Sequence, residues 1–421
     1  MPAPSADLPT GPADLLVDRI SLLLTMDGGA PGARDPELGA IEDAAVAFQG
    51  DRLRYVGPRS GAPPARQVLD GRGCVALPGL ADPHTHACWA GSRSDEFQAR
   101  LAGARYSDIL EAGGGILSTV RATRAASLDT LRTTCSARLA GMRARGATTV
   151  EVKSGYGLEP LTEERMLRAA RASAPGGPRV VPTFLGAHAI PAELRGQREA
   201  YVRQVIEEQL PRCAPLAQAI DVYCDRGAFS LDEALAILQA GKALGLRLRA
   251  HAEQVAATGI AAAAAALGAT CVDHLERLDD AGVAALAAHG TIALLLPGAQ
   301  LYLHDSAPPV AALRAAGVRI ALGTDLNPGS SPVHDLWTIA TLGCLLQSLT
   351  VPEALLAITR NAGRALGQPE LGHLGVGAVA DLVLVRPPPG EPPTAASLVQ
   401  HLGGCRIEAV IQAGALVCTV S

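Results

Sequence analysis

The chain has 421 residues and a formal net charge of −5, with 48% hydrophobic and 18% charged residues. This composition is typical of a globular protein with a large core, and it disfavours a disordered chain or a nucleic-acid-binding surface. No apolar run reaches the roughly 20 residues of a membrane helix, and residues 1–7 lack the features of a secretory signal. The 9 cysteines are scattered without a C-x-x-C pair, which favours reduced thiols and a cytoplasmic location.

Both ends of the chain have a β-type pattern. Short apolar runs separated by glycine and proline turns fill residues 15–69, and similar runs return at 381–385 and 409–414. The two ends lack the long helical patterns of the middle. We therefore predict one small composite β-sandwich formed by the N- and C-terminal segments. The proline-rich segment 387–393 is expected to be a loop within it rather than a recognition segment.

The middle of the chain alternates strand-like apolar runs with helical patterns such as 231–244. Eight runs can be counted, ending at Ala81, Lys153, Gly186, Tyr223, Ala250, Val272, Leu296 and Gly323. Eight such units are what a closed parallel barrel requires. We therefore predict an α/β fold with a (β/α)8 TIM-like barrel inserted into the β-sandwich. The predicted boundaries are 1–75 for the N-terminal part of the sandwich, 76–368 for the barrel and 369–421 for the C-terminal part.

Two histidines, His84 and His86, follow the first of these runs. In extended backbone, residues two positions apart point to the same side, so both imidazoles can face one transition-metal ion such as zinc or iron. The alternative is a pair of surface histidines. Pro78-Gly79 and Asp82-Pro83 disfavour it, because they fix the backbone around the pair.

Further candidate ligands follow later runs: His251 after the fifth, His274 after the sixth and Asp325 after the eighth. Because the carboxyl ends of barrel strands meet at one face, three imidazoles and one carboxylate can converge on a single ion and leave a position for water. Each residue alone is more often a core or loop residue. Their shared position at successive strand ends favours a metal site.

This pattern resembles the amidohydrolase superfamily and, within it, the imidazolonepropionase family of histidine breakdown. The resemblance runs over residues 76–331, and its most specific stretches are 111–121, 150–157, 183–188 and 323–330. It implies one divalent or trivalent ion, Zn or Fe, and usually a homodimer. It also implies hydrolysis of the ring C–N bond of 4-imidazolone-5-propanoate to N-formimidoyl-L-glutamate. One alternative function is that of another cyclic amidohydrolase or heterocycle aminohydrolase. A second alternative is a non-enzymatic binding protein.

The resemblance also implies roles for individual residues. The implied metal ligands are His84, His86, His251 and Asp325, and the implied substrate contacts are Arg93, Tyr156, His188, Gln254, Asn327, Gly329 and Ser330. An arginine fork and a tyrosine hydroxyl suit the carboxylate tail of such a substrate. Taken without the resemblance, Arg93 could instead form a surface ion pair, and the 327–330 stretch could be a plain turn before a helix.

One position departs from related mononuclear deaminases, which carry a proton-shuttling glutamate three residues after the strand-five histidine. Here that position is Gln254, which can orient the ring but cannot transfer a proton at neutral pH. Glu253 is a candidate catalytic acid, or alternatively a residue at the first turn of a helix. Lys153 ends the second strand rather than the fourth, so it is not placed to bridge two metals and a single ion is favoured.

We expect a mechanism in which the metal lowers the pKa of its bound water, Asp325 accepts the proton, and hydroxide attacks the ring carbonyl. His274 would stabilise the developing negative charge. Arg93 and Tyr156 would hold the propanoate, which converts binding into alignment. The sequence leaves open whether the segment 93–121 closes over the site. No nucleic-acid or membrane partner is expected.

Overall fold

The computed structural model describes residues 11–27, 37–103, 114–173 and 176–419. Its larger part is a barrel of eight parallel strands in the order in which they occur in the chain. The strands are β6 (Leu80–Asp82), β7 (Ala147–Lys153), β8 (Arg179–Ala187), β9 (Ala219–Cys224), β10 (Arg247–Ala252), β11 (Cys271–His274), β12 (Ile292–Leu295) and β13 (Ile320–Leu322). The eight predicted runs end at these strands, which confirms the predicted barrel.

The first and last strands of the barrel meet through residues just beyond their ends. Thr85 and Leu326 form a parallel bridge, and the Asp325 amide donates to the His84 carbonyl at 3.0 Å. Below this bridge, the buried Asp82 carboxylate accepts hydrogen bonds from the Thr324 amide (3.1 Å) and hydroxyl (2.6 Å). The candidate ligands on either side of this junction are therefore fixed relative to each other by backbone contacts.

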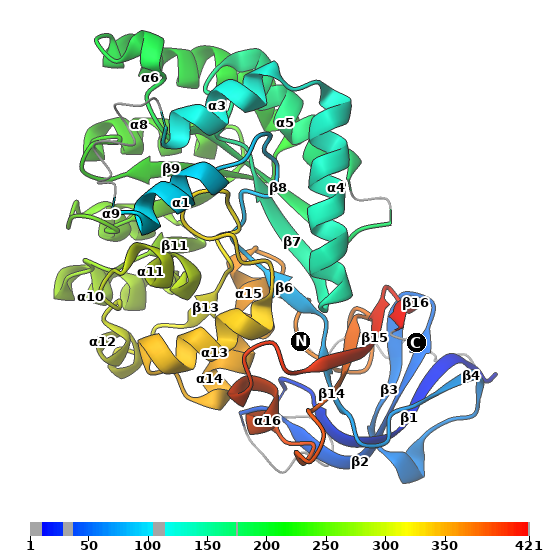
Figure 1. The fold of residues 1–421 in the computed structure, drawn as a ribbon. Coiled ribbons are helices and arrows are strands. Elements are labelled where there is room, and N and C mark those ends of the chain that lie inside the picture. Colours follow the sequence, from blue (N-terminus) through cyan, green and yellow to red (C-terminus); the bar gives the residue numbers. More distant parts are fainter. Residues whose placement is uncertain (1–10, 28–36, 104–113, 174–175, 420–421) are drawn as a thin grey trace.

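Helices cover the outside of the barrel (Figure 1). The predicted helical pattern at residues 231–244 is the helix α8. The helices are α1 (Ser94–Leu101), α3 (Ile116–Ala125), α4 (Leu128–Ala144), α5 (Pro160–Ala172), α6 (Arg198–Gln204), α7 (Leu210–Cys213), α8 (Leu231–Ala243), α9 (Ile260–Leu267), α10 (Asp280–His289), α11 (Pro297–Leu303), α12 (Val310–Ala315), α13 (Leu336–Gln347), α14 (Val351–Ala357), α15 (Arg360–Ala365) and α16 (Ala395–Gln400). Local sequence signals explain where some helices begin. Ser230 and Glu233 form a capping box at the N-terminus of α8, and Pro160 is the first residue of α5.

A second sheet joins the two ends of the chain and lies at the lower right of Figure 1. Its strands are β1 (Ala13–Leu24), β2 (Ala40–Gln49), β3 (Arg52–Pro58), β4 (Ala65–Asp70), β5 (Val75–Pro78), β14 (Leu382–Arg386), β15 (Arg406–Gln412) and β16 (Ala415–Thr419). Strand β5 pairs in parallel with β1 and antiparallel with β14, which ties the N-terminal to the C-terminal segment. The prediction of an additional β-structure built from both termini is confirmed, and the segment 387–393 is a loop between β14 and α16.

Gly79 is the single residue between this sheet and the barrel, since β5 ends at Pro78 and β6 begins at Leu80. A side chain there would lie 2.2 Å from the Thr148 hydroxyl, so only glycine allows the two sheets to approach this closely. The chain then continues directly through β6 to His84 and His86.

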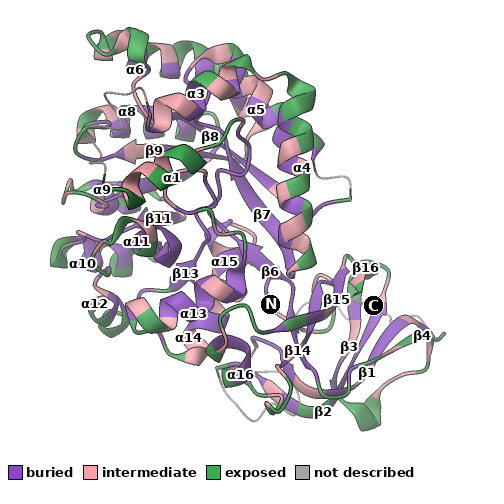
Figure 2. Ribbon diagram, in the orientation of Figure 1, coloured by how far each residue is buried: buried purple, intermediate pink, exposed green. Residues whose placement is uncertain are grey.

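The barrel strands are buried almost throughout, as the purple ribbon in Figure 2 shows. One large hydrophobic cluster fills the space between strands and helices, and a second lies within the terminal sheet. Within the described ranges, no helix has the length and apolar character needed to cross a lipid bilayer. The predicted turn glycines at 28–32 and residues 104–113 of the candidate lid segment lie outside the described residues.

Candidate metal centre

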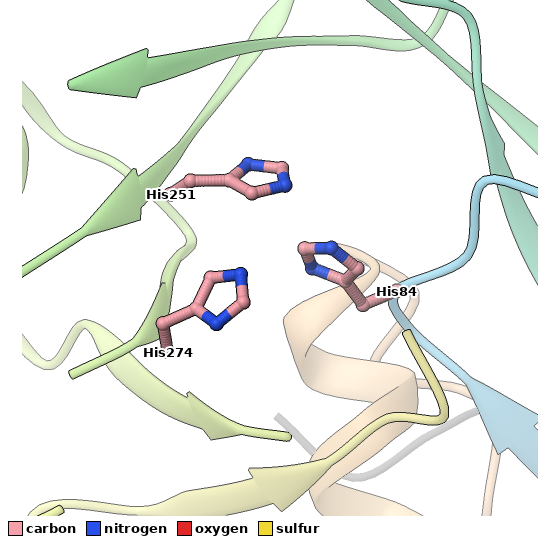
Figure 3. Close-up of side chains that lie close together, drawn as sticks. All are labelled: His84, His251 and His274. Carbon is pink, nitrogen blue, oxygen red and sulfur yellow. The ribbon is translucent and has the colours of Figure 1, made fainter. Parts of the chain in front are cut away.

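Four predicted ligands meet at the carboxyl end of the barrel. The Nε2 atoms of His84 and His86 each lie 3.5 Å from Oδ1 of Asp325. The Nε2 atom of His251 lies 3.4 Å from that of His86. All four side chains are buried. Figure 3 shows the rings of His84, His251 and His274 directed toward one common space from three different strand ends.

These three separations are those expected between neighbouring ligands of one ion, and the ligand atoms of His84, His86 and Asp325 form one mutually close group. Bonds of about 2.0–2.2 Å from a zinc-type ion to nitrogen and oxygen place neighbouring ligand atoms about 3.3–3.6 Å apart. The buried Nε2 atom of His84 has no hydrogen-bond partner among the described residues, so its lone pair is free to bind a cation. Burial lowers the pKa of both His84 and His86, which keeps them neutral, as a metal ligand must be. The residues therefore suit a divalent metal ion.

Carboxylates face the other ring nitrogen of two of these histidines. The Nδ1 atom of His84 lies 2.7 Å from Oδ2 of Asp273, and the Nδ1 atom of His251 lies 3.1 Å from Oδ2 of Asp221. Because an ionised carboxylate can only accept a hydrogen bond, the His84 ring is held with the proton on Nδ1 and the lone pair on Nε2, and Asp221 favours the same tautomer of His251. The strand-end pattern of the sequence does not point to either aspartate as a partner of a histidine. Their signal was an acidic residue inside an otherwise apolar strand, as in Ala219–Cys224.

A buried network of charges supports these carboxylates. The Lys153 ammonium lies 2.6 Å from Asp221 and 2.9 Å from Glu151, and the Arg249 guanidinium lies 2.9 Å from Glu151. Burial opposes the charge on Lys153, but the two acids outweigh it and raise the pKa of Lys153 to about 12. Lys153 ends the second strand as predicted, and its ammonium is held by these ion pairs rather than free to bridge two metals.

His274 lies beside the four ligands, with its ring centroid 5.3 Å from that of His251 and 5.8 Å from that of His84. Its φ of +80° is a left-handed conformation that non-glycine residues rarely adopt, at a cost of about 1–3 kcal/mol. Burial lowers the pKa of His274, but the Glu276 carboxylate, with Oε1 at 3.9 Å from Nδ1, outweighs this effect, so the pKa is raised. This environment favours the cationic form of the ring.

Tyr156 and His188 form one wall of the site. The His188 ring stacks on the His86 ring, with centroids 4.9 Å apart, and the Tyr156 ring lies 5.4 Å from His188 and 5.7 Å from His86. The Nδ1 atom of His188 lies 3.0 Å from the Gly155 carbonyl, which can only accept, so this nitrogen carries the proton. Burial lowers the pKa of His188 to about 4, so the ring is neutral and its Nε2 atom can accept a hydrogen bond.

Arg93 lies against the loop that follows Asp325. Its guanidinium pairs with Glu96 at 2.6 Å and packs on Gly329, where an added side chain would lie 2.8 Å from Nη1. Asn327 closes this loop by accepting from the amides of Gly329 and Ser330, both at 2.8 Å. Its own amide donates to the Asp325 carbonyl at 2.7 Å. The structure thus brings these four predicted substrate residues to the side of the site that carries Asp325.

Glu253 and Gln254 lie directly after strand β10. The Glu253 carboxylate accepts from the Thr258 hydroxyl at 3.2 Å and the Ala261 amide at 3.3 Å, so it caps the start of α9. Within the described chain, the clusters of potential metal ligands do not include Glu253. Gln254 is half-buried. Glu253 therefore lies in the bend after β10, outside any helix, and its carboxylate reaches across to the start of α9.

The barrel and its centre are typical of one class of enzyme. The family model described as "Amidohydrolase family" matches residues 75–417, which is more than half of the chain. The chain therefore belongs to the amidohydrolase family.

Curated relatives narrow this assignment. The imidazolonepropionase of Rubrobacter xylanophilus is 44% identical over 413 residues, covering 96% of this chain and 98% of that protein. That of Cupriavidus pinatubonensis is 48% identical over 360 residues, covering 84% of this chain and 85% of that protein. Within the amidohydrolases, the chain belongs with the imidazolonepropionases.

Solved structures share the fold at low identity. A triazine hydrolase from Arthrobacter aurescens superposes with a TM-score of 0.72 at 18% identity, covering 96% of this chain and 94% of that one. An adenosine deaminase from Xanthomonas campestris with bound zinc superposes with a TM-score of 0.69 at 19% identity, covering 97% and 93%. These two structures support the barrel and its accompanying sheet.

Proposed function

We propose that this protein hydrolyses the ring C–N bond of 4-imidazolone-5-propanoate to give N-formimidoyl-L-glutamate, a step of L-histidine degradation. One observation carries the proposal: His84, His86 and Asp325 form one close group, with His251 beside His86, in a chain that is more than 40% identical to imidazolonepropionases over most of its length. His84, His86, His251 and Asp325 would hold the ion. When bound, it would supply Lewis-acid chemistry that activates water and polarises a carbonyl.

Two residues are placed to handle charge and protons during ring opening. The His274 ring would donate a hydrogen bond to the substrate carbonyl oxygen and so stabilise the negative charge that develops there. The buried Asp325 carboxylate would accept a proton from water and return it to the ring nitrogen that leaves. The proton needed for C–N cleavage is thereby kept within the site.

The propanoate tail is assigned to Arg93 and Tyr156. The buried Nε atom of Arg93 has no hydrogen-bond partner among the described residues, which leaves a donor for a carboxylate. The Tyr156 ring lies beside His86 and His188, and burial raises the pKa of its hydroxyl, so it stays a neutral donor. The remaining contacts to the ring and its substituents are assigned to His188, Gln254, Asn327, Gly329 and Ser330.

We further propose that the ion is zinc or iron and that the protein acts in the cytoplasm as a homodimer, without nucleic-acid or membrane partners. A His3Asp ligand set accepts either metal, and the net charge of −5 supports the absence of a nucleic-acid partner. Elemental analysis of the purified protein, light scattering after size-exclusion chromatography and cell fractionation test these three points.

The experiment that tests the function is a hydrolysis assay with freshly generated 4-imidazolone-5-propanoate before and after chelation. We expect turnover of this substrate, its loss on chelation, and its return with added Zn²⁺ or Fe²⁺. Hydantoin, cytosine and guanine serve as comparison substrates because they lack the carboxylate tail. Preferential turnover of one of these would overturn the substrate assignment.

A further inference from the structure

We propose that Glu163 is a positioning residue that holds Tyr156 and His188 in place through the backbone of the loop 154–158. The inference rests on the proposed function, because that is where Tyr156 and His188 acquire a role. Glu163 touches neither substrate nor metal ligands in this assignment. It acts on two residues that do.

The Glu163 carboxylate is fully buried in the first turns of α5 and faces the loop that precedes this helix. Its Oε2 atom accepts from the Gly155 amide at 2.8 Å, and its Oε1 atom accepts from the amides of Gly157 and Leu158, both at 2.7 Å. Burying a carboxylate is costly unless hydrogen bonds replace its lost hydration. Three short bonds from a single loop meet that requirement here.

Arg124, on α3, holds the opposite side of the same loop. Its Nε atom donates to the Gly157 carbonyl at 2.7 Å, and its Nη2 atom donates to the Leu158 carbonyl at 3.2 Å. The amides of the loop are therefore bound by an anion and its carbonyls by a cation. This arrangement fixes the peptide planes on both sides of residue 157.

The loop conformation is one that needs such support. Gly155 has a φ of +106° and Leu158 a φ of +52°. A side chain at Gly155 would lie 2.9 Å from the Leu185 carbonyl, and one at Gly157 would lie 2.7 Å from the Glu163 amide. Left-handed and crowded backbone of this kind persists only where surrounding contacts impose it.

The loop held by Glu163 positions two residues of the proposed substrate site, Tyr156 and His188. Tyr156 stands between Gly155 and Gly157, both bound to Glu163. The Gly155 carbonyl accepts the Nδ1 proton of His188 at 3.0 Å and so sets which nitrogen of that ring faces the site. Movement of Gly155 would therefore displace the Tyr156 hydroxyl and loosen the His188 ring together.

The test compares Glu163→Gln with Glu164→Gln in the metal-loaded enzyme. The Gln variant keeps one acceptor oxygen but turns an NH₂ group toward a loop amide. We expect faster hydrogen exchange in a peptide containing residues 154–158, a fall of about 100-fold in kcat/KM, and unchanged metal content. Glu164 is the next residue on the same helix and pairs with Arg168 and Arg212 at the surface, so its substitution should change none of these.

A double-mutant cycle with Tyr156→Phe separates positioning from general stability. If Glu163 acts through Tyr156, Glu163→Gln should cost less in the Tyr156→Phe background than in the parent, so that the two effects are not additive. Additive effects, or unchanged exchange of the loop peptide, would overturn the inference.

Two further measurements keep the outcomes distinct. If Glu163→Gln does not fold, Glu163→Asp is the alternative variant, because it retains the charge on a shorter side chain. Hydrogen exchange and kcat/KM equal to those of the parent enzyme would overturn the inference. Values between those of the parent and a full loss would support it. Absence of imidazolone hydrolysis by the parent enzyme would refute the proposed function alone. Loop exchange in the Glu163 variants would still decide whether this carboxylate holds the loop.

Discussion

The Nδ1 atom of His84 lies 2.7 Å from Oδ2 of Asp273, and the next residue after Asp273 is His274. One strand end thus orients a proposed metal ligand with one side chain and presents a catalytic candidate with the next. Successive side chains of a regular strand point to opposite faces. The left-handed backbone at His274 and Leu275 breaks that alternation, so both side chains reach the same centre.

Replacing Asp273 by Asn should weaken metal binding by about 10- to 100-fold, because the amide orients the His84 ring less firmly than a carboxylate does. The dissociation constant can be measured by competition with a chromophoric chelator. Asp280→Asn, at an exposed position at the start of α10, is the matched control and should bind metal as the parent does. Equal affinities for both variants would exclude an orienting role for Asp273.

His274→Ala should lower kcat by about 100- to 1,000-fold while leaving the metal content unchanged, because the ring stabilises charge without holding the ion. Steady-state kinetics together with elemental analysis of the same sample check this. If the variant lost its metal but kept its turnover per bound ion, His274 would belong with the ligands instead.

Arg93→Met should raise KM for 4-imidazolone-5-propanoate, because a carboxylate tail would lose its charged partner. An imidazolone with a methyl group in place of the propanoate gives the control, since its weaker turnover should not change further in the variant. A similar loss with both substrates would show that Arg93 supports the fold of the 327–330 loop rather than the tail.

Glu253→Gln distinguishes a helix cap from a proton carrier. Because the carboxylate accepts from Thr258 and Ala261 at the start of α9, the variant should lose about 1 kcal/mol in the free energy of unfolding and keep most of its kcat. Urea unfolding and steady-state kinetics provide the two readouts. A large fall in kcat with an unchanged free energy of unfolding would show that Glu253 takes part in proton transfer.

The barrel could be predicted from the sequence because its strands are apolar runs separated by helical patterns, and every run ends close to an observed strand. The proposed ligands stand out in the sequence because His84 and His86 have the spacing of extended backbone and the others follow later strands. For both the strands and the proposed ligands, the pattern lies within short stretches of the sequence.

The rest of the site depends on backbone geometry that spacing does not reveal. Glu253 stands two positions after His251, which in an extended strand would place both on one side. Its φ of +49° turns the chain out of the strand and sends the carboxylate to α9. The hydrogen bond between Asp273 and His84 joins residues 189 positions apart. The hydrogen bond from the Gly155 amide to Glu163 depends on a backbone conformation that glycine allows. Neither contact has a signature in a single sequence.

The barrel closes where Asp82 meets Thr324, 242 residues later in the chain. Of the proposed ligands, His84 and His86 lie on one side of this seam and Asp325 on the other. A ribosome exposes the first pair long before the last strand exists, so a nascent chain cannot offer the complete ligand set until most of the barrel has been synthesised. Loading of the ion would then be a late step of maturation. The bound ion would link the first strand of the barrel to be synthesised with the last.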